Sequence, residues 1–233
     1  MNQKEIQTLL QRLKQRGFIQ SHRKGATGIG YTLEQELELV ESNVSIPDIG
    51  GRVELKATRR SSSSLVTLFT FNRAVWQLPK RQIIETYGYI EKSERQALYS
   101  TVFYGTPNPQ GLSISFEKEQ NKVLLQYEDE VLAIWSIYTI IGKFITKLER
   151  LLLVIADNRF SKDDIHEEFH YNEAYLLDIP DPEKFMQVFE NGQIAIDLRM
   201  HLKPNGTVRN HGTGFRIVEK NLLKLYKHQR RLI

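Results

Sequence analysis

Two spacings of hydrophobic residues alternate along this chain of 233 residues and predict a mixture of helices and strands. Apolar residues at helical spacing, with caps or prolines at the ends, predict helices over 4–16, 32–41, 80–87, 136–148, 181–190 and 219–229. Alternating or continuous apolar runs predict strands over 52–58, 65–71, 98–104, 112–116, 123–127 and 151–156. This succession indicates a mixed α/β (α+β) fold.

The strand predicted over 52–58 carries two charged residues at a spacing that gives them a common side. Residues i and i+2 of a strand point to the same face, so Glu54 and Lys56 project together. Val53 and Leu55 then face the opposite way, into a core. This arrangement predicts a carboxylate and an ammonium group side by side on one face of the strand.

Asp48 adds a second carboxylate just before this strand, where the glycine pair 50–51 lets the chain bend back toward Glu54. Two carboxylates suit Mg²⁺, which accepts hard oxygen ligands together with phosphate oxygens. The metal would activate a water, and Lys56 would stabilise charge on an attacked phosphate. The alternative is a surface strand with an ordinary Glu–Lys pair, because the bare D-x(5)-E-x-K pattern is weak.

The segment 196–199 alternates apolar and charged residues and suggests a base-reading strand. Asp197 and Arg199 share one face, while Ile196 and Leu198 point inward. In the major groove an arginine can donate two hydrogen bonds to guanine, and an aspartate can accept one from cytosine. The alternative is that Asp197 and Arg199 form a surface salt bridge.

A glycine-containing segment, 210–216, provides two further candidates for base recognition, His211 and Arg216. Glycines allow the backbone to approach a ligand closely. The alternative for His211 is that it caps a turn.

Charge alone indicates a polyanionic partner only weakly, since the formal net charge is +4 and the pI is about 9.1. The distribution of charge is more informative. Four basic residues flank the candidate metal site in sequence, and we expect them to contact phosphates: Arg23, Lys24, Arg59 and Arg60. The basic clusters of the first and last predicted helices are better explained as solvated surface.

Cysteine is absent, which excludes disulfides and zinc–thiolate sites. No signal peptide is recognisable, and the longest apolar runs, such as 131–141, are too short and too interrupted to span a bilayer. We therefore expect a soluble, cytoplasmic protein without a membrane partner.

Several motifs in a fixed order resemble the MvaI/BcnI group of type II restriction endonucleases, which are similar in their catalytic part to the repair nicking enzyme MutH. The resemblance extends over nearly the whole chain. The motifs are Gly28-Ile29-Gly30-Tyr31-Thr32-Leu33-Glu34, Asp48 with Glu54-Leu55-Lys56, Tyr87-Gly88-Tyr89, the apolar run 151–156, Phe169-His170-Tyr171 and the segment 211–216.

The resemblance implies roles for residues around the predicted strand. It assigns Asp48, Glu54 and Leu55 as metal ligands, Lys56 as the catalytic lysine, and Glu34 as a further acidic residue lining the site. Mg²⁺ is the implied cofactor.

The resemblance also implies a fold of the PD-(D/E)xK nuclease superfamily. This is a restriction-endonuclease-like mixed sheet flanked by helices, with two lobes around a DNA-binding cleft. We expect residues 1–100 to form mainly the catalytic lobe and 101–233 mainly the recognition lobe.

The implied activity is Mg²⁺-dependent hydrolysis of double-stranded DNA at a short CCNGG-type site, CCWGG or CCSGG, by a monomer that nicks the two strands in turn. Thr70 stands where BcnI-like members have a histidine, so the central base stays open. A companion DNA methyltransferase is expected, without a stable complex. The alternatives are a MutH-like nicking enzyme and a DNA-binding module that has lost catalysis.

Overall fold

The computed structural model describes residues 3–39, 49, 53–61, 63–71, 75–161 and 166–233. The chain divides into two compact units, each built from separate stretches of sequence. Unit 1 comprises Met1–Ser64, Ile145–Asp181 and Tyr226–Ile233, and unit 2 comprises Leu65–Phe144 and Pro182–Leu225. The sequence suggested a single boundary near residue 100, whereas the chain passes between the units four times. The assignment of catalysis and recognition to separate parts stays a prediction.

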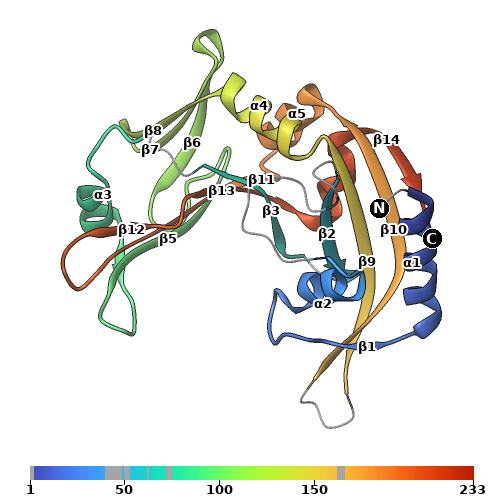
Figure 1. Cartoon of the computed structure of the whole chain (residues 1–233). Coiled ribbons are helices and arrows are strands. Elements are labelled where there is room, and N and C mark those ends of the chain that lie inside the picture. The colour runs from blue at the N-terminus through green and yellow to red at the C-terminus, as the bar shows by residue number, and fades with distance from the viewer. Residues whose placement is uncertain (1–2, 40–48, 50–52, 62, 72–74, 162–165) are drawn as a thin grey trace. The chain divides into compact units, whose positions relative to one another are not determined.

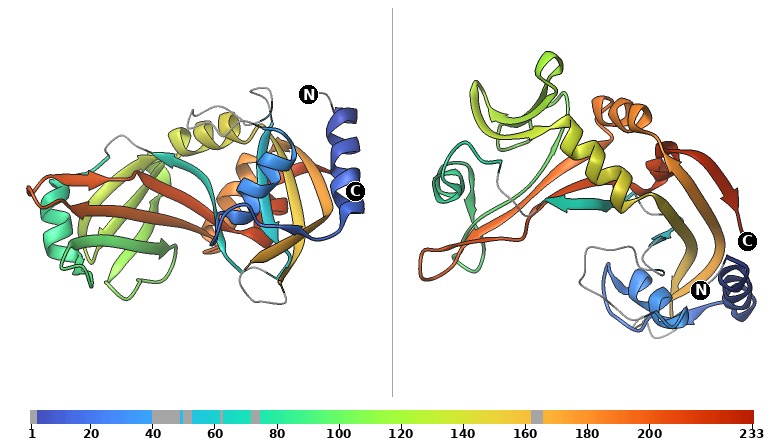
Figure 2. Two further views of the ribbon diagram at one scale, coloured as in Figure 1. Left: turned by 60° about the horizontal axis from the view of Figure 1, so that its bottom comes forward. Right: turned by 45° about the horizontal axis from the view of Figure 1, so that its top comes forward.

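Unit 1 is built on a five-stranded sheet (Figure 1). Its strands are β1 (Ile19–Gln20), β2 (Glu54–Arg59), β9 (Arg150–Phe160), β10 (Glu167–Pro180) and β14 (Tyr226–Arg231). The order is β1-β10-β9-β2, and β14 also pairs with β10. β2 runs parallel to β9, whereas all the other pairs are antiparallel. The long strands β9 and β10 run side by side in both views of Figure 2.

Two helices complete unit 1, α1 (Gln3–Arg16) against β10 and α2 (Gly28–Glu36) against β2. In α1, Ile6, Leu10 and Leu13 recur at helical spacing and are buried, with Leu10 fully inaccessible. The helix ends before Gly17, whose φ of +74° suits glycine. The predicted helix 4–16 is thus confirmed.

Unit 2 contains two sheets. The six-stranded sheet comprises β3 (Leu65–Phe71), β4 (Tyr89–Ile90), β5 (Gln96–Phe103), β11 (Ile194–Leu202), β12 (Val208–Asn210) and β13 (Thr213–Val218). Its order is β3-β13-β11-β5-β4, and β12 also pairs with β11. The second is an antiparallel sheet of β6 (Leu112–Glu117), β7 (Lys122–Tyr127) and β8 (Glu130–Ser136).

The helical segments of this part are α3 (Lys80–Tyr87), α4 (Ile137–Lys147), α5 (Pro182–Glu190) and the 3₁₀ segments η1 (Lys118–Gln120) and η2 (Glu219–Leu225). The last residues of α4 belong to unit 1. In the described parts of the chain, no helix is long and apolar enough to cross a membrane.

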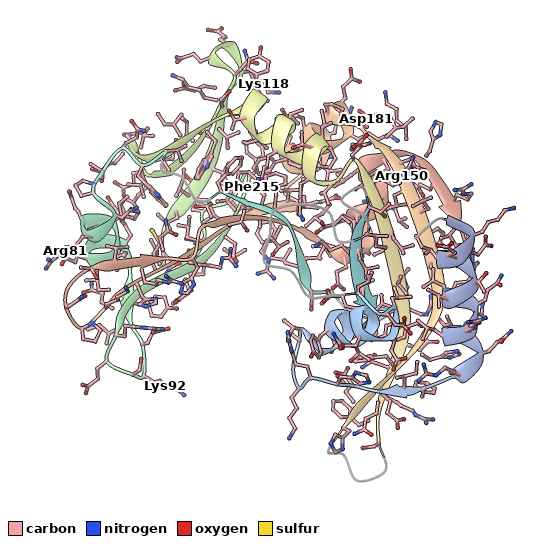
Figure 3. All side chains as sticks on the ribbon, viewed as in Figure 1. Arg81, Lys92, Lys118, Arg150, Asp181 and Phe215 are labelled. Atoms are coloured by element: carbon pink, nitrogen blue, oxygen red, sulfur yellow. The ribbon has the colours of Figure 1, made fainter. Side chains whose placement is uncertain are left out.

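An aromatic cluster fills the core of unit 2. Phe215, labelled in Figure 3, stacks on Phe69 at a centroid distance of 5.1 Å and meets Trp135 edge-on at 5.9 Å. Trp135 is 1% exposed and belongs to this core. β13 lies between β3 and β11 in the sheet. Aromatic packing of this kind stabilises it there beyond the effect of burial alone.

The prediction of a helix over 219–229 is wrong. The chain forms a 3₁₀ turn, η2, and then the strand β14. Leu222 and Leu225 are buried three residues apart, which a 3₁₀ segment accommodates. From Tyr226 onward the backbone pairs with β10, from Pro180 back to Tyr175, so tertiary pairing overrides the local pattern.

Two other boundaries differ from the prediction. α2 begins at Gly28 and ends at Glu36, whereas the sequence suggested 32–41. The backbone turns at Glu38, which has a positive φ of 56°, so the helix stops there. The predicted residues 40–41 lie outside the described part of the chain.

Leu10→Ala should lower the free energy of unfolding by roughly 2–5 kcal/mol, because it leaves a cavity under α1. Leu9→Ala, at a half-buried neighbouring position, should cost markedly less. Urea unfolding followed by circular dichroism compares the two. Equal losses would show that Leu10 is not a principal contact of α1 with unit 1.

Candidate active site and nucleic-acid interface

Strand β2 brings Glu54 and Lys56 together. Parallel pairing with β9 sets Glu54 beside Leu151 and Lys56 beside Leu153, which fixes both backbone positions. Lys56 Nζ donates a hydrogen bond of 2.6 Å to Glu54 Oε1. The two side chains therefore share one face of the strand, as the pleat predicts. Glu54 is 3% exposed, so this is a buried carboxylate and not an exposed surface pair.

A second lysine, Lys147, reaches the same carboxylate from the last position of α4. Its Nζ lies 2.6 Å from Glu54 Oε2. Among the described residues Oε2 has no partner with hydrogen-bond geometry, so this contact is an ion pair by distance. Lys147 is far from Glu54 in sequence and belongs to no motif around it, so sequence reasoning missed it.

Tyr226 fixes the turn that follows Lys147. Its hydroxyl donates to the carbonyl oxygen of Leu148 at 3.1 Å, and the ring is fully buried. Burial, with the negative charge of Glu54 as a smaller cause, raises the pKa of Tyr226 far above its usual value. The phenol therefore stays protonated and remains a hydrogen-bond donor to this turn.

The donor chemistry of this region is compatible with Mg²⁺. Glu54 offers carboxylate oxygens, and its two counter-ions sit on long, flexible side chains that a metal can displace. Leu55 is 5% exposed and apolar, so only its backbone carbonyl could be a ligand. Asp48 lies outside the described residues, as do Gly50 and Gly51. Within the described residues no cluster of three or more acidic or histidine side chains could hold a metal.

Glu34 lies on α2, the helix that packs against β2, and its side chain is half-buried. This helix begins at Gly28, where no other residue fits. A Cβ there would lie 2.3 Å from the Arg23 carbonyl oxygen and 2.6 Å from Ser21 Oγ. The close approach of these two chain segments explains the glycine at the start of the helix.

Arg59, at the end of β2, binds the glycine-rich loop, the segment 24–30 that leads into α2 and includes its first residues. Its Nε and Nη2 each donate a 2.6 Å hydrogen bond to the carboxylate of Glu167, in a bidentate pair. Its Nη1 and Nη2 also donate to the carbonyl oxygens of Ala26 and Gly25 at 3.3 and 3.4 Å. Arg59 thus connects β2, β10 and the glycine-rich loop; its expected phosphate contact stays a prediction.

Arg60 forms hydrogen bonds with side chains of the neighbouring strands β9 and β10. It donates to Glu173 at 2.5 Å, to Asp157 at 2.6 Å and to Asn172 at 2.7 Å. The hydrogen bonds to Glu173 and Asp157 raise the pKa of Arg60. The Arg60 guanidinium is also the largest cause of the lowered pKa of Asp157.

The other two expected phosphate contacts, Arg23 and Lys24, are exposed in the loop before α2. The Arg23 guanidinium lies 3.7 Å from the ring centroid of Tyr31, a cation–π distance. The exposure of both side chains is compatible with the phosphate contact predicted for them.

In unit 2, Asp197 lies at a junction of three strands and is 8% exposed. Its Oδ1 accepts a 2.7 Å hydrogen bond from Thr101 Oγ1, and its Oδ2 accepts one of 3.2 Å from Arg216 Nη1. Arg216 Nη2 also donates to the carbonyl oxygen of Leu65 at 2.6 Å. The ion-pair partner of Asp197 is thus Arg216 and not Arg199.

Arg199 brings together two other predicted site residues. Its Nη2 lies 3.3 Å from Thr70 Oγ1 and 3.5 Å from the carbonyl oxygen of His211. The His211 amide donates back to the Arg199 carbonyl oxygen at 2.9 Å. Among the described residues, the buried Nε atoms of Arg199 and Arg216 have no hydrogen-bond partner. Each guanidinium therefore retains donor capacity.

Gly214 lies among these side chains. A Cβ there would lie 3.6 Å from both Asp197 Cβ and Arg216 Cγ, and 3.7 Å from Arg199 Nη2. The five residues singled out from the sequence thus form one cluster on β3, β11 and β13 and the segment before β13: Thr70, Asp197, Arg199, His211 and Arg216.

His201 and Tyr99 extend this cluster and were missed from sequence. The rings of His201 and His211 are 5.5 Å apart, and Tyr99 Oη lies 2.9 Å from His201 Nδ1. Burial, followed by the charge of Arg95, lowers the pKa of His201. The register of β5 against β11 brings Tyr99 and His201 close, and no local pattern reveals that pairing.

Comparison with known proteins agrees with the motifs. The model of the MvaI/BcnI restriction endonuclease family matches residues 7–226. The structure of the restriction endonuclease MvaI with its cognate DNA substrate matches with a TM-score of 0.81 and 25% identity, covering 100% of both chains. MvaI without DNA matches in fold with a TM-score of 0.59 and 24% identity, covering 100% of this chain and 99% of the other. No curated protein matches the sequence.

Arg59→Lys should loosen the glycine-rich loop while keeping the charge, since lysine cannot reproduce the bidentate pair or both carbonyl contacts. Losing roughly 1 kcal/mol of local stability corresponds to about fivefold faster amide exchange. Hydrogen exchange at the Gly28 amide, which donates to the Gly25 carbonyl oxygen, measures the effect.

Arg60→Lys is the matched control, because the partners of Arg60 lie on β9 and β10 and not in the loop. Equal acceleration in both variants would contradict the assignment of loop anchoring to Arg59.

Proposed function

We propose, from the premise that the chain belongs to the MvaI/BcnI restriction endonuclease family, that it hydrolyses both strands of double-stranded DNA at a short CCNGG-type site. As a restriction endonuclease it acts on DNA. The proposal adds Mg²⁺ dependence, a site of the CCWGG or CCSGG type, and sequential nicking of the two strands by a monomer.

One observation supports the catalytic part most strongly. A buried carboxylate, Glu54, and a lysine, Lys56, contact each other on one face of β2, in a fold similar to that of an endonuclease solved with DNA. Removing a carboxylate from water costs free energy unless cations compensate it. A buried glutamate paired with a partly buried lysine at the start of a strand therefore suggests a functional site and not an ordinary surface ion pair.

The proposed site holds Mg²⁺ through Asp48, Glu54 and the backbone carbonyl of Leu55. The metal, when bound, supplies an acidified and oriented water and neutralises charge on the phosphate. Lys56 turns from Glu54 toward the attacked phosphate, where its ammonium stabilises the charge that develops. Glu34 contributes a further acidic side chain from α2.

The proposed recognition surface is the cluster on β3, β11 and β13. Arg199 donates to guanine O6 and N7, and Asp197 accepts from the amino group of cytosine. The half-buried Arg199 supports this role, because its Nη2 makes only long contacts, of 3.3 and 3.5 Å, which a base could replace. His211 and Thr70 lie next to Arg199 and contact bases with it. Thr70 is the residue assigned to the central base.

Phosphate contacts position the DNA in this proposal. They are assigned to Arg23, Lys24, Arg59 and Arg60, of which all but Arg59 are exposed. The proposal keeps a two-lobed arrangement with DNA bound in a cleft, and a companion methyltransferase that forms no stable complex with the enzyme.

Two alternatives are kept. A MutH-like nicking enzyme would share Glu54 and Lys56 but cut one strand under the control of a partner. A non-catalytic module would use only the recognition cluster on β3, β11 and β13. The buried Glu54–Lys56 pair argues against the second, because a purely binding protein has no use for it.

Digestion of a sequenced plasmid by the purified protein with Mg²⁺ tests the function. We expect discrete fragments whose ends share a CCNGG-type sequence, and none with EDTA. Lys56→Ala should cut at least about a hundredfold more slowly, because the charge-stabilising cation is lost.

A single nick at each site would favour the MutH-like alternative. Specific binding without cleavage would favour the non-catalytic one. An unchanged rate in Lys56→Ala would refute the proposed mechanism.

Arg199→Ala tests recognition. Loss of a bidentate guanine contact should weaken cognate binding by about 1–3 kcal/mol, roughly 5- to 150-fold, and relax selectivity at that base pair. Binding to cognate and substituted duplexes is compared at fixed salt, with Arg209→Ala on β12, an exposed arginine, as control. Selectivity equal to that of the parent would refute the assignment.

A further inference from the structure

We propose that Lys147 is a positioning residue that acts as the second counter-ion of Glu54 and weakens divalent-metal binding by the DNA-free protein. This inference rests on the proposed function, in which Glu54 is a metal ligand. It concerns a lysine outside the Asp–Glu–Lys motif, supplied by a helix that carries no other candidate residue.

Both carboxylate oxygens of Glu54 are contacted by cations. Lys56 Nζ lies 2.6 Å from Oε1, and Lys147 Nζ lies 2.6 Å from Oε2. A divalent ion that ligates Glu54 must therefore displace one ammonium group or bind close to both. The lysines and the metal compete for the same buried carboxylate, because like charges repel strongly where water is scarce.

The two lysines are held differently. Lys56 shares β2 with Glu54, so its side chain can turn toward a phosphate without any change in the backbone. Lys147 is the last residue of α4, where the partial negative charge of the helix end favours its ammonium group. Leu148 is fully buried and accepts the hydrogen bond from Tyr226, which fixes the backbone directly after Lys147.

These constraints give Lys147 a defined task. It stays on Oε2 and orients the carboxylate so that Oε1 is the oxygen presented when Lys56 leaves. Without Lys147, one oxygen of Glu54 loses its cation in the DNA-free protein, and a divalent ion meets less repulsion there.

Mn²⁺ binding to DNA-free protein, followed by electron paramagnetic resonance of the free ion, tests this without relying on cleavage. Lys147→Met should bind Mn²⁺ at least about tenfold more tightly than the parent, because one adjacent positive charge is removed. Lys147→Arg, which keeps the charge, should bind about as weakly as the parent. Lys14→Met removes a charge from an exposed position on α1 and should have no effect.

Lys147→Gln guards against a folding defect in the methionine variant, since it removes the charge but retains a hydrogen-bond donor. Circular dichroism identifies the variants that fold, and tighter binding is expected in each uncharged variant that does. Glu54→Gln, made in the Lys147→Gln background, should abolish the gain and thereby locate the ion.

The outcomes separate the inference from the function on which it rests. If Glu54→Gln lowers the affinity for Mn²⁺ but the uncharged Lys147 variants bind no more tightly than the parent, the role of Lys147 is refuted while Glu54 remains a ligand. If Glu54→Gln has no effect in either background, the proposed metal site itself fails, and the inference fails with it.

Discussion

The burial of one carboxylate, that of Glu54, is the constraint on which the candidate active site depends. A charge that is 3% exposed is stable only with compensating cations, and Lys56 and Lys147 supply them from two different elements. β2 must therefore pair with β9 in the observed register, and α4 must end where its last residue reaches Oε2. Tyr226, from the C-terminal stretch, secures the turn between α4 and β9.

Local patterns predicted the elements with strong periodicity. The helix 4–16 and the strand 65–71 match α1 and β3 closely. In α1 the apolar spacing directly reflects one buried face, whereas β3 buries the adjacent residues Leu68 and Phe69. The C-terminal segment could not be predicted in the same way. Its leucines fit both helical and 3₁₀ spacing, and only the pairing of β14 with β10 decides between helix and strand.

The residues of the candidate site likewise divide into those that a local pattern reveals and those that only the tertiary structure brings together. Glu54 and Lys56 could be placed together because the pleat relates residues two apart. Lys147, Tyr99 and His201 could not, because they reach the clusters through helix and strand placements that join distant parts of the sequence. The sequence also left open whether Asp197 pairs with Arg199. Strand order decides for Arg216, since β13 lies between β3 and β11.

Both clusters pair their carboxylates internally in the DNA-free protein. Glu54 is held by lysines, and Asp197 by Arg216 and Thr101. If these residues bind metal and DNA as proposed, each new contact replaces an internal one. The net free energy of binding is then only the difference between the two contacts. A correct base or phosphate restores every partner, whereas a wrong one leaves a buried charge or donor unpaired, which is costly. Selectivity would then arise largely from the penalty for incomplete exchange and not from the strength of any single new bond.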